Sequence, residues 1–401
     1  MMKYDLVFEG GGAKGVVFSG ALQTFEALGH TPGRLLGTSA GAITATALAA
    51  GYTPQEILNA LAEKVDGHSA LANFLGEPEP FTPLEIESSA TRHLFRAVNL
   101  PLIPDRLEEK LDNLLLETLV ARSSLRSVFA FIERGGWYSA ANFLDWLRER
   151  LDSGTYHARP RRFSHLTLAQ FYTQTHVDLS LIASDTTDGL MLVLNHRTAP
   201  DVPLVWAVRM SMSVPLLWAE VVWQKEWGKY RGRDLTDHTI VDGGILSNFP
   251  IELFVSRDPL VTAIMGPNQS DAVLGMLIDE TLPVPGAAAL STPSPGSLQF
   301  NELRTVQRLN RLLDTVFNAH DKMLIDAFAH LVIRLPAKGY SITEFDMSDE
   351  RRDWLVNAGQ EAMQDYFARQ MSQVSFDIQT DQQAQHMVQM ADKMAVKMLS
   401  R

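Results

Sequence analysis

The amino-acid sequence predicts a layered α/β fold with parallel strands at its centre. A short apolar run, residues 4–8, passes through a glycine-rich turn into a helical pattern, and the same order of elements repeats from residue 34. Apolar runs of strand length return after residue 178, beyond a long helical stretch. Because distant parts of the chain supply the strands, we expect one interwoven domain rather than two separate ones.

The first unit is the strand YDLVF (4–8), followed by GGGAKG (10–15) and a helix over Lys14–Leu28. Apolar residues recur at helical spacing through that stretch, and Gly29 is a typical helix terminator. The pattern therefore predicts a strand, a glycine loop and a helix in direct succession.

The second unit begins with RLL (34–36), passes through GTSAG (37–41) and continues as an alanine-rich helix that ends at Gly51. Alanine has the highest helix propensity of all residues, which supports a helix here. Thr53 and Glu56 are spaced as a capping box around Pro54, which predicts a further helix from there through Val65.

From residue 66 to 153 helical periodicity dominates, as in RLEEKLDNLLLETLVARSSL (106–125) and FLDWLRERL (143–151). Later strands are expected at 178–184, 190–195, 218–223, 238–244, 273–279 and 331–336, and helices at 299–330 and 349–370. A proline-rich stretch, 283–296, indicates a surface loop. We expect one domain over residues 1–370 with a helical insertion at 66–132, and an amphipathic helical tail at 371–401.

Composition excludes several classes of function. The formal net charge of -12 argues against a nucleic-acid partner, which would need a basic surface. The chain has no cysteine, so disulfides, thiolate metal sites and a cysteine nucleophile are excluded. The first residues lack a signal-peptide pattern, and no apolar run approaches the length of a membrane span. We expect a cytoplasmic protein, peripheral to membranes, for which export would need a route without a cleaved signal.

GTSAG fits the pattern G-x-S-x-G, in which a serine lies on a sharp turn between strand and helix. Ser39 is the candidate nucleophile, and Gly37, Thr38, Ala40 and Gly41 form the turn around it. The flanking glycines allow strand and helix to approach closely. A small-residue run for packing is the alternative interpretation, and the position between strand and helix favours the nucleophile.

The glycine loop could bind a phosphate or could supply backbone N–H groups to the oxyanion of an acyl transfer. A Walker A loop is not matched, because Lys14 precedes Gly15 and Val16 follows. Gly10, Gly12 and Gly15 fit a dinucleotide pattern, but no acidic residue ends the second strand. We therefore predict an oxyanion hole, drawn from Gly10, Gly11, Gly12, Ala13, Lys14 and Gly15.

A serine nucleophile also needs a base. The later histidines are His176, His196, His238, His320, His330 and His386, and none lies in a glycine-flanked turn after a strand. Asp242 does, in TIVDGGILSNFP, where Gly243 and Gly244 follow it. Burial beside an apolar pocket would raise the pKa of this carboxyl toward useful basicity, so a Ser39–Asp242 dyad is chemically workable.

GGGAKG, GTSAG and DGG in this order, with RMSMSVP (209–215) before the last, resemble the patatin-like phospholipases. The resemblance touches most of residues 4–370 but not 66–132 or the tail. It implies a three-layer α/β/α sandwich with a mostly parallel sheet, and a lipid acyl hydrolase with Ser39 as nucleophile, Asp242 as base and N–H groups around Gly11 and Gly12 as oxyanion hole. It implies no metal and no cofactor. The expected substrates are phospholipids or lysophospholipids.

Two other functions stay open. A triad-type carboxylesterase of short-chain esters would depend on a histidine such as His320 or His330. A noncatalytic lipid- or nucleotide-binding module would not react at Ser39.

Three further features concern partners. Trp218, Trp223, Trp227 and Tyr230 lie among lysines and arginines, a mixture that suits either a membrane interface or a packed hairpin. Four methionines of the tail share a helical face, which could dock on the chain's own body, a second copy or a membrane. Residues 66–132 are a candidate lid. The expected partners are an acyl-lipid substrate and a peripheral membrane surface, with a homo-oligomer or a protein activator left open.

Overall fold

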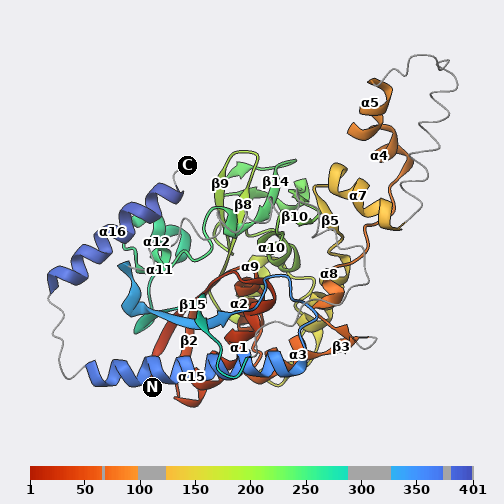
Figure 1. The fold of residues 1–401 in the computed structure, drawn as a ribbon. Helices are drawn as coiled ribbons and strands as arrows, with labels where there is room; N and C mark the ends of the chain where they lie inside the picture. Colours follow the sequence, from red (N-terminus) through yellow and green to blue (C-terminus); the bar gives the residue numbers. More distant parts are fainter. Residues whose placement is uncertain (66–67, 98–122, 288–326, 374–380, 400–401) are drawn as a thin grey trace.

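The computed structural model describes residues 1–65, 68–97, 123–287, 327–373 and 381–399. Within these residues, eight strands form the main sheet, and helices cover both of its faces (Figure 1). The chain is a three-layer α/β/α sandwich, as predicted. No helix in this part of the chain is both long and apolar enough to cross a bilayer.

The centre of the main sheet is parallel, as the alternation of elements predicted. In order across the sheet, its parallel strands are β8 (Leu179–Asp185), β2 (Thr31–Thr38), β1 (Lys3–Phe8), β15 (Ala272–Pro283) and β16 (Val332–Lys338). Parallel strands end at the same edge of a sheet, so the segments that follow β1 and β2 meet there.

The sheet forks at β8. Strand β9 (Leu190–Leu194) pairs antiparallel with one edge of β8, and Ala183 faces both β9 and Asp242, the last residue of β14 (Thr239–Asp242). β14 therefore lies on the same edge of β8 as β2, just beyond the end of β2. β11 (Val221–Val222) extends this branch. The fork brings the end of β14 close to the end of β2.

Alternate residues of each strand point to opposite layers. In β1, Leu6 and Phe8 belong to one core and Val7 to the other. The first core is covered by α1 (Val17–Ala27), α2 (Ala40–Ala49) and α15 (Asp349–Gln373). The second is covered by α11 (Glu252–Val255), α12 (Pro259–Met265) and α16 (Asp381–Leu399).

Most of the elements predicted from local sequence patterns in the first 65 residues are present in the structure. A 3-10 turn, η1 (Gly12–Val16), precedes α1, and together they occupy the predicted helix. The predicted capping box of Thr53 and Glu56 begins α3 (Pro54–Ala62). That helix ends before the predicted Val65, because the chain turns there into a short strand, β3 (Lys64–Val65), which pairs with β4 (His68–Ser69).

The region between α3 and β8 is mainly helical in its described part. It contains η2 (Ala72–Phe74), α4 (Pro83–Glu87), α5 (Ala90–Ala97), α7 (Ser123–Glu133), α8 (Ala141–Asp152) and α9 (Leu168–Thr175), with a small hairpin of β6 (Thr155–Tyr156) and β7 (Arg159–Pro160). In Figure 1, α4, α5 and α7 project away from the sheet. Most of the helix predicted at 106–125 lies outside the described residues.

Strand β5 (Gly136–Tyr138) occurs where the sequence predicted none, and two strands occur where it predicted a single one. β5 pairs with β10 (Leu216–Trp218), with Tyr138 opposite Trp218. The two segments are far apart in the sequence, so this pairing could not be predicted from local patterns. The predicted strand 218–223 is consequently divided between β10 and β11. The predicted strand at 331–336 is part of β16, preceded by the turn η6 (Ala329–Leu331), whereas most of the helix predicted at 299–330 lies outside the described residues.

The aromatic segment 218–230 is a packed hairpin rather than an exposed interface. It contains η3 (Lys225–Trp227) and β12 (Lys229–Tyr230), and β12 pairs with the following strand, β13 (Arg233–Asp234). Trp218, Trp223, Trp227 and Tyr230 are all buried. The indole N–H groups of Trp218 and Trp223 donate to backbone carbonyls at 3.0 and 3.1 Å. These rings are therefore not available to anchor the protein in a membrane.

The C-terminal helix α16 packs on the chain's own body. Its small residues Ala391 and Ala395 are fully buried in the second core, and four methionines border them. Those methionines are Met387, Met390, Met394 and Met398. Of the docking partners considered for this helical face, the structure shows the body of the same chain.

Candidate active site

Ser39 lies on the sharp turn between β2 and α2, as predicted for a nucleophile elbow. Its backbone has φ 52° and ψ -119°, a conformation that non-glycine residues adopt only under constraint. The glycines of the turn are required by contact: a Cβ on Gly37 would lie 2.3 Å from the Gly41 carbonyl oxygen, and one on Gly41 would lie 2.4 Å from that of Phe8. Thr38 is buried at the end of β2, and Ala40 begins α2.

The glycine loop lies against this turn. A Cβ on Gly10 would come within 3.0 Å of the Ser39 Cβ, and one on Gly15 within 2.8 Å of the Ala40 Cβ. The same position on Gly10 would lie 2.3 Å from Asn248 Oδ1. Side chains are therefore excluded where the two turns meet, and the backbone of the loop can approach Ser39 directly.

The hydrogen bonds of the loop separate engaged N–H groups from available ones. The N–H groups of Gly10, Ala13 and Lys14 donate to the carbonyls of Asn248 at 3.3 Å, Ile342 at 2.9 Å and Gly11 at 3.2 Å, respectively. The N–H groups of Gly11 and Gly12 stand at the start of η1, where a helix offers its first N–H groups no internal acceptor. These two N–H groups therefore have no acceptor within η1.

Lys14 does not point its charge at an empty anion site. The side chain is buried, and its ammonium forms an ion pair with Glu280, near the end of β15. A phosphate-binding loop would keep this cation for its ligand. The pairing therefore weighs against the nucleotide interpretation of GGGAKG.

Asp242 ends β14 at the fork of the sheet and is almost completely buried. Its Oδ1 accepts the N–H of Gly244 at 2.8 Å, within the turn η4 (Gly243–Ile245). A Cβ on Gly243 would lie 2.5 Å from the Ile182 carbonyl oxygen, so this glycine is needed for close packing against β8.

Burial raises the pKa of Asp242 to about 7, and the Gly244 N–H and the Ser39 hydroxyl oppose this rise. Ser39 is thus close enough to interact with the carboxylate. Even so, Asp242 Oδ2 has no hydrogen-bond partner of regular geometry among the described residues. Catalytic hydrogen bonds are often long or misaligned before substrate binds. The structure thus places a serine with a strained backbone near a buried carboxylate, one oxygen of which has no hydrogen-bond partner among the described residues.

An apolar cavity opens beside Ser39. Its lining includes Ser39, the α2 residues Ile43 and Thr44, and aromatic side chains. Its larger apolar lining residues include Ile43, Leu61, Leu71, Phe74, Trp218 and Phe345. Such a lining suits an acyl chain better than a polar ligand.

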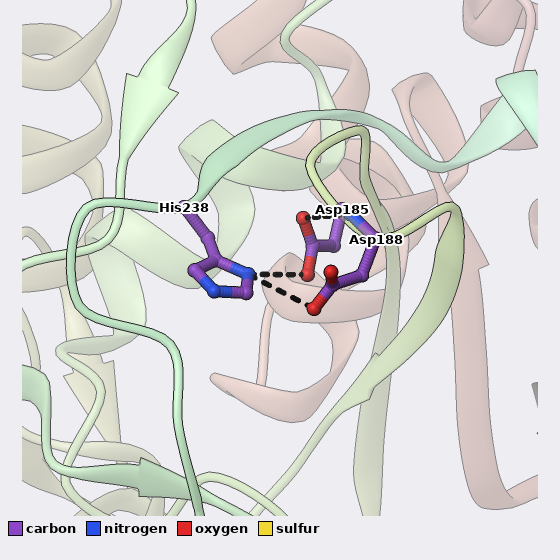
Figure 2. A group of neighbouring side chains, drawn as sticks. All are labelled: Asp185, Asp188 and His238. Atoms are coloured by element: carbon purple, nitrogen blue, oxygen red, sulfur yellow. Dashed lines mark hydrogen bonds and ion pairs between the residues drawn. The ribbon is translucent and has the colours of Figure 1, made fainter.

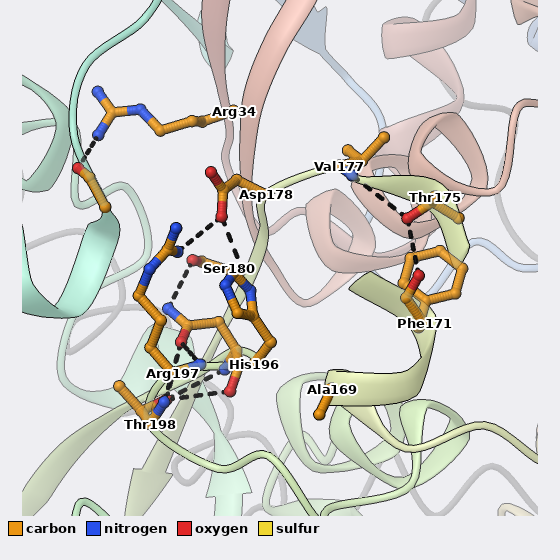
Figure 3. Close-up of polar contacts among 12 residues, drawn as sticks. Arg34, Ala169, Phe171, Thr175, Val177, Asp178, Ser180, His196, Arg197 and Thr198 are labelled. Atoms are coloured by element: carbon orange, nitrogen blue, oxygen red, sulfur yellow. Dashed lines mark hydrogen bonds and ion pairs between the residues drawn. The ribbon is translucent and has the colours of Figure 1, made fainter. Parts of the chain in front are cut away.

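The histidines considered as alternative bases lie elsewhere. His196 follows β9 and lies beside the amino end of β8. Its Nδ1 is 3.7 Å from an oxygen of Asp178, which also forms an ion pair with Arg197 (Figure 3). Burial lowers the pKa of His196 to about 4. His330 precedes β16, which is separated from β2 by β1 and β15. His320 lies outside the described residues.

His238 belongs to a small polar cluster with Asp185 and Asp188 (Figure 2). Its Nδ1 lies 2.8 Å from Asp185 and 3.6 Å from Asp188, a spacing that could hold a metal ion. Arg233 already forms an ion pair with Asp188, however, and the N–H groups of two turn residues donate to Asp185. Internal contacts thus account for the charges of this cluster.

Three residues that surround Ser39 were not predicted as part of the site. Asn248 donates to the Gly10 carbonyl at 3.0 Å, and Glu9 accepts from Asn248 at 3.2 Å. Ser211, the last residue of α10 (Leu204–Ser211), accepts the N–H of Ser39 at 3.1 Å. Two of them lie within motifs of the sequence: Ser211 in RMSMSVP and Asn248 in TIVDGGILSNFP.

The model of the family described as patatin-like phospholipase matches residues 6–255. YqhO of Bacillus subtilis (strain 168), an uncharacterized protein, is 26% identical over 371 residues, which cover 89% of this chain and 96% of YqhO.

Two solved structures share 16% sequence identity with this chain. VipD from Legionella pneumophila has a TM-score of 0.43, and the match covers 91% of this chain and 67% of that one. ExoU in its complex with SpcU, from the type III secretion system of Pseudomonas aeruginosa, has a TM-score of 0.36 and covers 91% of this chain and 52% of that one. The present chain therefore spans about half the length of ExoU.

Proposed function

Because this chain belongs to the patatin-like phospholipase family, we propose that it releases fatty acids from phospholipids or lysophospholipids through an acyl-enzyme on Ser39, with Asp242 as the base. The observation that carries the proposal is the meeting of these two residues at the fork of the sheet. Ser39 is held in a strained turn, and burial raises the pKa of the neighbouring Asp242 to about 7. A base with a pKa near the working pH is the most effective one.

The proposed reaction has two balanced halves. Asp242 Oδ2 accepts the proton of the Ser39 hydroxyl while Ser39 Oγ attacks the ester carbonyl, and the resulting oxyanion binds the N–H groups of Gly11 and Gly12. The carbon–oxygen bond of the ester then breaks, and Asp242 returns the proton to the departing alcohol. Water repeats the sequence on the acyl-enzyme, which releases the fatty acid and restores Ser39.

The apolar cavity supports an acyl substrate. Ser39, residues of the glycine loop and residues of α2 line the same cavity, so an acyl chain could lie there while its carbonyl faces the glycine loop. Burying each methylene group of such a chain contributes about 0.8 kcal/mol. The headgroup would then remain at the mouth of the cavity.

A fluorophosphonate probe tests the proposal, because it reacts covalently with an activated serine. We expect the wild-type protein to carry the label on Ser39, as read by peptide mass spectrometry, and to release fatty acid from a mixed panel of phospholipids and lysophospholipids. Ser39→Ala and Asp242→Asn should each abolish both signals while circular dichroism shows a folded protein.

Two outcomes would decide for the other functions. Loss of labelling in His330→Ala or His320→Ala, with Asp242→Asn still active, would favour a triad carboxylesterase of short-chain esters. A wild-type protein that is folded yet unlabelled at Ser39 would favour a noncatalytic binding module.

We further propose that the protein works in the cytoplasm at the surface of a membrane, where its substrates reside. Exposed apolar side chains on the projecting helices support this contact: Leu84 on α4, Leu94 on α5 and Ile132 on α7. Co-sedimentation with phospholipid vesicles should fall when Leu84 and Ile132 are both changed to Asp. Unchanged sedimentation would refute a role of these helices in membrane contact.

A further inference from the structure

We infer that Ser211 positions the nucleophile of the proposed reaction by holding the backbone N–H of Ser39. The two residues are 172 positions apart, and the Ser39 N–H donates to Ser211 Oγ at 3.1 Å in the interior of the protein. Ser211 is fully buried. Because Ser211 contacts the backbone of Ser39 and not the reacting atoms, it is a positioning residue. The inference rests on the function proposed above.

The contact explains how a strained serine is kept in place. A non-glycine residue at φ 52° and ψ -119° has an unfavourable backbone conformation, which persists only where the surrounding structure determines it. On its carboxyl side, the Ser39 carbonyl accepts the N–H groups of Ala42 at 2.9 Å and Ile43 at 3.3 Å in the first turn of α2. On its amino side, Ser211 supplies the acceptor. Both peptide groups of Ser39 are therefore fixed.

The same short segment also holds the base. The N–H of Asp242 donates to the carbonyl of Ser213 at 2.9 Å. Residues 211–213 thus contact the backbone of Ser39 with one end and that of Asp242 with the other. Since the two residues come from different strands, this segment, which we call the bracket, sets the separation of Ser39 Oγ and Asp242 Oδ2.

A buried arginine stiffens the bracket. The Arg209 guanidinium donates to Ser213 Oγ and, at 2.6 Å, to the carbonyl of Ala219. Ser213 Oγ in turn donates to the Arg209 carbonyl at 2.5 Å. No ion pair of Arg209 occurs among the described residues, so its hydrogen bonds are to neutral groups of the bracket and its continuation. This arrangement limits how far residues 211–213 can shift.

Ser211→Ala tests the inference, with Ser180→Ala as a matched control. Ser180 is also a buried serine whose hydroxyl accepts an N–H, that of the Asn195 amide at 3.0 Å, but it lies in the first half of β8 (Figure 3). Both variants lose a buried hydroxyl acceptor, and only the first loses the contact to Ser39. The readouts are kcat and KM on a soluble acyl ester, the rate of fluorophosphonate labelling, and the melting temperature.

In Ser211→Ala we expect kcat and the labelling rate to fall about 10- to 100-fold with KM within about twofold of wild type, because a small misplacement of a reacting group has effects of this size. Ser180→Ala should retain wild-type rates. Should Ser211→Ala not fold, Ser211→Cys serves instead, since its thiol has similar volume and is a weak acceptor.

Equal rates in Ser211→Ala and Ser180→Ala would overturn the inference, as would a raised KM with kcat unchanged. The wild-type result separates this failure from that of the proposed function. If wild-type protein is not labelled at Ser39, the proposed function itself fails. If wild type is labelled and Ser211→Ala is labelled equally fast, only the positioning role fails.

Discussion

The carboxylate of Glu9 accepts the backbone N–H of Ile278 at 2.6 Å, which joins the residue after β1 to the neighbouring strand β15. Asn248 bridges Glu9 and the Gly10 carbonyl, so the start of the glycine loop is held from two sides. We predict that Glu9→Ala lowers the free energy of unfolding by about 1–3 kcal/mol and slows fluorophosphonate labelling, because the Ile278 N–H would be left buried without its acceptor. Urea unfolding and labelling kinetics measure both effects. Glu9→Gln keeps an acceptor oxygen and should lie closer to wild type; equal losses in the two variants would contradict this explanation.

The raised pKa of Asp242 predicts the pH dependence of hydrolysis. A base must be unprotonated to act, so kcat/KM should rise with pH through about 7, the pKa of this buried carboxyl. Between pH 6 and pH 8 the increase should be about tenfold. Initial rates on a soluble ester across this range measure it. A rate that is flat from pH 5 to pH 8 would show that Asp242 is not the titrating base.

The same pKa predicts that Asp242 lowers stability above neutral pH. Below about pH 4 the carboxyl is protonated in both folded and unfolded chains, and the group makes no difference; as the pH rises to 7, only the unfolded chain loses the proton, so stability falls. Above pH 7 the full cost is at most about 4 kcal/mol, from about three pKa units. Asp242→Asn should therefore melt higher than wild type at pH 8 and similarly at pH 4. Asp145→Asn, which removes an exposed carboxylate, should show no such difference.

The cavity along α2 predicts a selective effect of filling it. Ile43 lines the cavity one turn after Ser39 and is only partly buried. In Ile43→Trp we expect kcat/KM to fall more than about tenfold for a long acyl ester and to change little for an acetyl ester, at a stability cost of about 1–3 kcal/mol from overpacking. A series of nitrophenyl esters of increasing acyl length measures the profile. A uniform loss over the series would mean that acyl chains bind elsewhere.

The hydrogen bonds of Asp392, on α16, to the segment before α12 should contribute to the free energy of unfolding. Its carboxylate accepts from the Ser256 hydroxyl at 2.6 Å and from the N–H groups of Arg257 at 2.7 Å and Asp258 at 3.0 Å, just before α12. Asp392→Ala should lower the free energy of unfolding by about 1–3 kcal/mol, because several donors lose their acceptor. Labelling at Ser39 should persist, since α16 covers the face opposite α2. Lys393→Ala, at an exposed neighbour, is the control for urea unfolding; similar losses in both would contradict the role of Asp392.

Features with local causes could be predicted from the sequence. The capping box of Thr53 and Glu56 begins α3 because its partners are three residues apart. Strands β1 and β2 contribute apolar side chains to both cores, because they lie between two helical layers. The strand-to-helix turns after them contain the glycines that the sequence shows at these places. The glycine-flanked turn after a strand distinguished Asp242 from the histidines, and the family resemblance then implied its role as the base.

Contacts between distant segments could not be predicted. The bond from Ser39 to Ser211 depends on where α10 ends relative to β2, and the pairing of Asp242 with Ala183 depends on the fork at β8. The glycine loop could not be resolved into engaged and available N–H groups, because the acceptor of Ala13 is Ile342, far along the chain. The division of 218–223 into two strands has the same cause, since β10 pairs with β5.

The fork at β8 has a consequence for the protein during its synthesis. Ser39 and Asp242 are separated by 203 positions (242 minus 39), so at about 5–20 residues per second roughly 10–40 s of translation pass between them. During that interval the emerging chain carries a serine without its base. On the proposed mechanism, lipid hydrolysis begins only when β14 has joined β8, and an incomplete chain on the ribosome is harmless to the membranes of the cell that makes it.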